Sequence, residues 1–181
     1  YTLCDVPSVT TGISFSAVSA TATTVGFTAP AQPRFGYVIF RSTSATPPVL
    51  ANGTIYTVNQ TTAVSSLTSG GNTYFCVYNG TATTGTATSL TSNTRYYYYV
   101  FSRNGLTAAE CASGPIYSTT ALTGSQITAP AVPSTVTAVP TMSGANLSWV
   151  AAAAGGSATP ISYVVEVYTS SAYTTHVGSS P

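Results

Sequence analysis

The feature that most constrains this chain is the close spacing of its glycine and proline clusters, which divide the sequence into short apolar runs. Within the runs, apolar and polar residues alternate with a period of two, as in Ile13 with Phe15 and Val25 with Phe27. Such alternation indicates strands with one buried and one solvated face, and the clusters mark turns. The runs span residues 13–18, 24–27, 36–40, 54–58, 73–78, 96–101 and 115–122. Many short strands at this spacing predict an all-β sandwich or barrel.

The composition agrees with a β fold and limits the partners. Hydrophobic residues make up 44% of the chain and charged residues only 4%, so 34 threonines and 24 serines supply most of the polar surface. Threonine is β-branched and suits a half-exposed strand. A net charge of +1 gives no electrostatic footprint for nucleic acid, and no apolar run approaches the roughly 18 residues of a membrane-spanning helix. We therefore expect neither a nucleic-acid partner nor membrane insertion.

The apolar pattern restarts after a proline-rich stretch, which indicates an internal repeat. Val25-x-Phe27 in the first part matches Leu147-x-Trp149 in the second. The predicted division is a first unit at 1–122, expanded between two of its strands, a linker at 123–132, and the N-terminal half of a second unit at 133–181. Half a sandwich cannot cover its own core. We expect further residues of a longer polypeptide to complete the second unit; the alternative is a neighbouring chain.

One segment resembles a known family. Leu90 and Thr94, followed by Tyr96, Tyr98 and Val100, resemble the strand-F signature of fibronectin type III domains. In that family a Leu and a Tyr frame the turn into strand F, and the Tyr hydroxyl bonds to nearby backbone. The resemblance implies an immunoglobulin-like (fibronectin type III-like) antiparallel β-sandwich, in tandem, with the second copy incomplete.

The same resemblance implies a set of core residues and a source. The expected structural core comprises Phe27, Tyr37, Ile39, Leu90, Tyr96, Tyr98, Val100, Trp149 and Tyr163. The expansion at 43–85, between strands C and E, is similar to that of modules in large secreted and cell-surface proteins of gliding-type Gram-negative bacteria. The resemblance implies no catalytic residue, because the family has none in this module.

Four consecutive tyrosines, Tyr96 to Tyr99, must divide between the two faces of one strand. If Tyr96 and Tyr98 point inward, the opposite face carries a candidate contact surface made of Val38, Phe40, Tyr97, Tyr99 and Phe101. Three interpretations stay open for this surface. The rings pack across strands, they dock another module or subunit, or they stack on sugar rings of a surface glycan.

Three cysteines allow at most one internal disulfide. In the sandwich that the resemblance implies, the chain entry and the loop between strands F and G lie at the same pole, so Cys4 and Cys111 are the candidate pair. A different pairing, or none, stays open. Cys76 is expected to be a buried free thiol. Asp5 and Glu110 adjoin the pair, but two carboxylates fall short of the ligands that calcium takes, so we expect no metal and no cofactor.

We therefore expect an extracellular, non-enzymatic protein. The predicted function is a structural and adhesive segment of a bacterial surface protein, acting as a spacer and as a contact module for other modules of the same polypeptide or for neighbouring subunits. One alternative is the protomer of an extracellular filament that is completed by strand exchange. Another is the polymer-binding accessory module of a secreted hydrolase.

Overall fold

The computed structural model describes residues 4–31, 36–61, 66–105, 111–152 and 161–168, together with the backbone strand at 176–180. Every regular element in these ranges is a β-strand. The first unit contains β1 (Thr11–Ser16), β2 (Thr23–Thr28), β3 (Gly36–Ser42), β4 (Leu67–Ser69), β5 (Asn72–Gly80), β6 (Thr84–Ala87), β7 (Arg95–Asn104), β8 (Ile116–Tyr117) and β9 (Leu122–Ile127). The strand content agrees with the all-β prediction.

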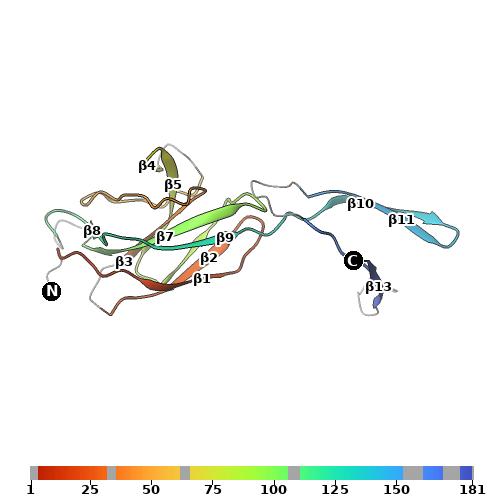
Figure 1. The fold of residues 1–181 in the computed structure, drawn as a ribbon, viewed down its shortest axis with the longest axis horizontal. Coiled ribbons are helices and arrows are strands. Elements are labelled where there is room, and N and C mark those ends of the chain that lie inside the picture. The colour runs from red at the N-terminus through yellow and green to blue at the C-terminus, as the bar shows by residue number, and fades with distance from the viewer. Residues whose placement is uncertain are drawn as a thin grey trace.

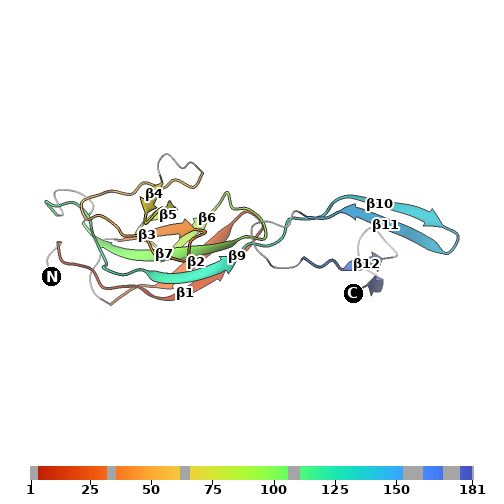
Figure 2. The same cartoon turned by 45° about the horizontal axis from the view of Figure 1, so that its top comes forward.

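Two antiparallel sheets form the first unit. One has the order β1-β2-β6, and the other has the order β4-β5-β3-β7, with both β8 and β9 paired to β7. Counted along the chain, β1, β2 and β6 stand as strands A, B and E, while β5, β3, β7 and β9 stand as C′, C, F and G. The fold is therefore an immunoglobulin-like, fibronectin type III-like sandwich. Figures 1 and 2 show β1 and β2 facing the sheet that contains β3 and β7.

The inter-sheet core follows the period-two pattern. Phe27 of β2 meets Tyr37 of β3, with ring centroids 4.7 Å apart. All seven residues of the first unit that were expected in the core lie in this cluster: Phe27, Tyr37, Ile39, Leu90, Tyr96, Tyr98 and Val100. On β7, alternate side chains point into this core, as the register of the tyrosine run predicts.

A third layer covers the other face of the β3–β7 sheet. The segment between β3 and β4, which we call the excursion (residues 43–61), lies on the side away from β1 and β2 (Figure 2). Its run at 54–58, expected to be a strand, is not one. Side chains replace the ladder there: the Thr54 carbonyl accepts the Tyr117 hydroxyl at 2.8 Å, and the Tyr56 carbonyl accepts the Asn79 amide at 2.7 Å.

The second part of the chain contains β10 (Ser134–Thr141), β11 (Gly144–Val150), β12 (Val165–Tyr168) and β13 (His176–Ser180). β10 pairs with β11, and β12 pairs with β13. The β10–β11 hairpin extends away from the first unit (Figure 1). Residues 123–127, expected to belong to a linker at 123–132, are instead part of β9, which pairs with β7 in the first unit. The division into a complete and an incomplete module stays a prediction.

Candidate functional site

The predicted contact surface on β3 and β7 is not an open surface. Val38, Phe40, Tyr99 and Phe101 are between 0% and 3% exposed, and Tyr97 is half-buried. These residues form a second core with Tyr74, Cys76 and Tyr117. They lie on the face opposite Tyr96 and Tyr98, as predicted. Of the three interpretations left open for this face, the structure favours packing within the unit, because the excursion covers the rings.

Tyrosine hydroxyls on this face hold the excursion in place. Tyr74 donates to the Thr46 carbonyl at 2.6 Å, and Tyr99 donates to the Ser44 carbonyl at 2.5 Å. Burial raises the pKa of Tyr99 to about 12, so its hydroxyl stays a donor at neutral pH. The excursion forms no β-ladder, and these hydroxyls provide its carbonyl groups with the hydrogen bonds that buried backbone requires.

Tyr56 is the aromatic side chain that the excursion itself contributes. Its ring lies edge-on to Phe40, with centroids 5.2 Å apart, and 5.5 Å from the ring of Tyr117. Its hydroxyl accepts the Ala51 amide at 3.0 Å. The sequence held a signal for this second core, because the unbroken apolar runs at 37–40 and 96–101 are typical of strands buried on both faces.

Two arginines lie inside the first unit and were not expected there. Arg41 is 6% exposed; its guanidinium lies over the rings of Phe75 and Tyr96, and it donates to the Gln60 carbonyl at 2.6 Å. Burial lowers the pKa of Arg41. Arg103 donates from Nε to the Asn79 side-chain oxygen at 2.9 Å. These cations therefore cross-link strands and the excursion rather than present charge to a ligand.

The tyrosine corner has the predicted geometry. Tyr96 is 5% exposed, and its hydroxyl accepts the backbone amide of Thr91 at 3.0 Å. Tyr98 lies on the same face, where burial raises its pKa to about 12. This corner fixes the entry into β7 and with it the alternation of the tyrosines.

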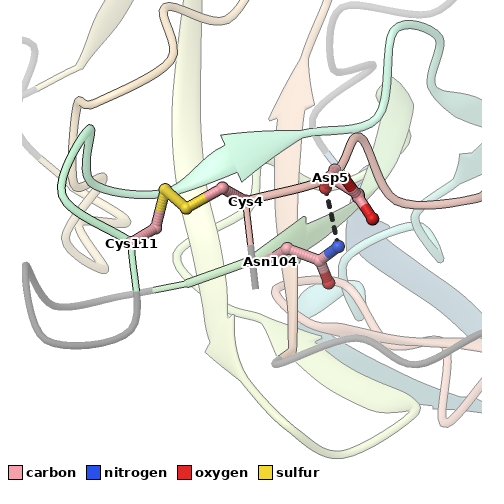
Figure 3. Close-up of a disulfide and its surroundings, with 4 residues drawn as sticks. All are labelled: Cys4, Asp5, Asn104 and Cys111. Atoms are coloured by element: carbon pink, nitrogen blue, oxygen red, sulfur yellow. Dashed lines mark hydrogen bonds between the residues drawn. A yellow bond between two sulfur atoms is a disulfide. The ribbon is translucent and has the colours of Figure 1, made fainter. Parts of the chain in front are cut away.

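One pole of the first unit contains the disulfide. Cys4 and Cys111 are bonded, with Cα atoms 5.3 Å apart (Figure 3). Beside the bond, the Asn104 side-chain amide donates to the carbonyl of Asp5 at 2.7 Å, which ties the N-terminal segment to β7. Glu110, the second acid considered for calcium, lies outside the described residues. Cys76 is a buried free thiol, and burial raises its pKa to about 12.

The second unit presents a groove of about 260 Å³ between β11 and β12. Trp149 and Tyr163, both expected in a core, meet with ring centroids 5.6 Å apart but are only half-buried. Both residues were expected on the inner face of an incomplete module, and within the described part of the chain no second sheet covers them. Pro133, Val136, Leu147 and Val165 line the same groove.

Within the described ranges, no three His, Cys, Asp or Glu side chains gather where they could hold a metal ion. The same ranges contain no helix long and apolar enough to cross a membrane.

Comparison with known proteins gives matches to solved structures alone. No protein-family model matches the chain, and no curated protein matches it. A segment of titin is 18% identical over 69% of this chain and 33% of that one, with a TM-score of 0.41. A redesigned β-sandwich protein is 18% identical over 68% of this chain and 91% of that one, with a TM-score of 0.42.

A fibronectin type III domain from a human protein is 15% identical over 85% of both chains, with a TM-score of 0.41. The chain spans about a third of the titin segment. The fold class rests on the strand order of the two sheets.

Proposed function

We propose that this chain is a non-catalytic structural and contact segment of an extracellular bacterial surface protein. The first unit would be a self-contained spacer, and the second would carry the contact surface. The observation that supports this division is where apolar side chains are exposed. Both faces of the β3–β7 sheet are covered within the first unit. In the second unit, Val136, Leu147 and Val164 are 66%, 41% and 68% exposed, and such a patch is typical of an interaction surface.

The polar groups of the first unit support a structural role. The hydroxyls of Tyr74 and Tyr99, the two inner arginines and the Asn79 amide bind other parts of the same chain. They hold the excursion and the strand ends in place. We propose on this basis that the unit is a scaffold and not an enzyme.

The disulfide supports an extracellular location. Such bonds persist in oxidising compartments and are rare in the cytosol, and Cys4–Cys111 closes most of the first unit into one loop. The partners we propose are other modules of the same polypeptide or neighbouring subunits. The glycan-binding alternative needed an open aromatic row, and of that row Tyr97 alone is half-exposed, in a shallow groove beside Thr123 and Ser125.

Hydrogen exchange on the dilute chain tests the proposed division. We expect slow exchange in β7 and fast exchange in β10, β11 and β12. Strong protection of 135–168 at a concentration where the chain is monomeric would show that the second unit needs no contact, and the proposal would be wrong. Thiol labelling of protein taken from its source tests the location: one reactive thiol after denaturation, from Cys76, supports export, and three contradict it.

A further inference from the structure

The outer edge of β11 lacks a strand partner within the described residues. β11 pairs with β10 alone, whereas its counterpart β2 pairs with β1 on one side and with β6 on the other. An unpaired edge presents a row of free backbone donors and acceptors, and it is a template for another strand. A two-stranded hairpin is also marginal by itself in water.

The two edges of this hairpin are protected differently. β10 has a bulge between Ser134 and Thr137, with Thr135 at φ 54°, and it contains Pro140. Bulges and prolines are features that prevent a strand edge from pairing. β11, Gly144–Val150, contains no proline and no charged residue, and the bulge lies in its partner. One edge is therefore blocked and the other is left able to pair.

The sequence of β11 is complementary to itself. An antiparallel pair of two copies that is centred on Leu147 places Ala145 of each copy opposite Trp149 of the other, so the large ring faces a small side chain. Asn146 then lies opposite Ser148, where an amide meets a hydroxyl. Cross-strand pairs of this kind stabilise a sheet, and like charges that would oppose pairing are absent from the strand.

The hydrogen-bonding pattern agrees with the same register. β10–β11 is a hairpin in which Thr141 pairs with Gly144 next to the turn, and Ala145 and Leu147 pair with Pro140 and Ala138. Pairs in an antiparallel ladder alternate between those that exchange hydrogen bonds and those that do not. Pro140 has no amide hydrogen, so the Pro140–Ala145 pair does not exchange hydrogen bonds, and neither does the Ala138–Leu147 pair two residues further on. The backbone N–H and C=O groups of Ala145 and Leu147 therefore point to the free edge of β11.

We propose that two copies of this chain associate through β11, edge to edge about a two-fold axis, to form a four-stranded β10-β11-β11-β10 sheet. The inference rests on the proposed function, in which the second unit carries the contact surface, and it names a second copy as the partner. The contact is isologous, so it closes after two copies. It is also small, so the dimer is weak and depends on concentration.

Cysteine cross-linking tests the register. In Leu147→Cys the two new thiols lie opposite each other across the axis, at a Cα separation of about 5.5 Å for a hydrogen-bonded pair, which suits a disulfide. Ala145→Cys is the matched control, because its two thiols lie about 13 Å apart at 3.3 Å per residue. Under mild oxidation we expect covalent dimers from Leu147→Cys at least tenfold faster than from Ala145→Cys. Equal rates, or no dimer from Leu147→Cys, overturn the inference.

The unmodified chain gives an independent readout. Trp149 is the single tryptophan, so its emission reports the second unit alone, and we expect a shift to shorter wavelength as concentration rises together with a dimer in sedimentation equilibrium. A monomer at every concentration up to about 1 mM overturns the inference. A chain that stays monomeric but exchanges quickly over 135–168 would refute the β11 dimer and not the contact role of the second unit. Slow exchange over 135–168 in the monomer would refute the contact role itself, so the two proposals fail by different results.

Discussion

The cover over the outer face of β3 and β7 depends on Tyr56, and Tyr56→Ala should open it. The ring makes two aromatic pairs, with Phe40 at 5.2 Å and with Tyr117 at 5.5 Å. Each such pair contributes about 0.5–1.5 kcal/mol beyond area burial, so the two pairs alone give about 2 kcal/mol, and the substitution should lower the free energy of opening the excursion by at least that amount. The β1-β2-β6 sheet does not touch this ring, and we expect the sandwich itself to remain folded.

Cys76 provides the assay, since it lies under the excursion and lines the same small groove as Tyr56. With the disulfide intact it is the single free thiol, so its labelling rate measures how often the cover opens. A loss of about 2 kcal/mol corresponds to roughly a 30-fold faster reaction. Val58→Ala is the control, because Val58 is 52% exposed and should change the rate by less than about threefold. If Tyr56→Ala labels at the wild-type rate, the excursion is not what buries this face.

Three further predictions concern the first unit. Tyr96→Phe leaves the Thr91 amide without its acceptor and should cost about 1–3 kcal/mol in urea unfolding; an unchanged midpoint would contradict the corner. Burial raises the pKa of Tyr98 to about 12, above the ordinary value near 10, so the unfolded chain loses this proton first. The contribution of Tyr98 to stability should be complete below pH 10 and fall by about 1.4 kcal/mol per pH unit up to pH 12, measured as the difference between the wild type and Tyr98→Phe because Tyr99 and Cys76 also titrate late in the folded state; a difference that is flat across that window would refute the burial. Cys4→Ser opens a loop with a sequence separation of 107 and should cost about 4–5 kcal/mol in the chain-entropy model, read from the thermal midpoint.

Local pattern was enough to predict the strand register. The alternation through Tyr96 and Tyr98 assigned the faces of β7, because side chains on a strand alternate whatever covers them. The corner at Tyr96 followed from a short motif whose hydrogen bond spans five residues. The Cys4–Cys111 disulfide could be predicted only with the strand order of a sandwich, because that order brings two residues from opposite ends of the unit to one pole.

What covers each face was not predictable in the same way. The excursion has no ladder and therefore no period, and it is held by contacts between residues far apart, such as Tyr99 with Ser44. A hydrogen bond between a hydroxyl and a carbonyl 55 positions apart produces no periodic pattern in the sequence, so it could not be predicted. The buried arginines were missed for the same reason, since Arg41 is covered by Gln60 of that excursion and by rings from two other strands.

The two units differ in how an apolar face can be covered. In the first, a coil covers the sheet because Tyr74, Tyr99 and Tyr117 provide hydroxyls that bind its carbonyls. The hairpin of β10 and β11 contains no tyrosine, so a coil laid on its apolar face would find no such donors and its own backbone groups would be unsatisfied. A strand satisfies its backbone through the ladder instead. The free edge of β11 is where a ladder can continue, and for this reason the backbone of this hairpin calls for a strand as its partner.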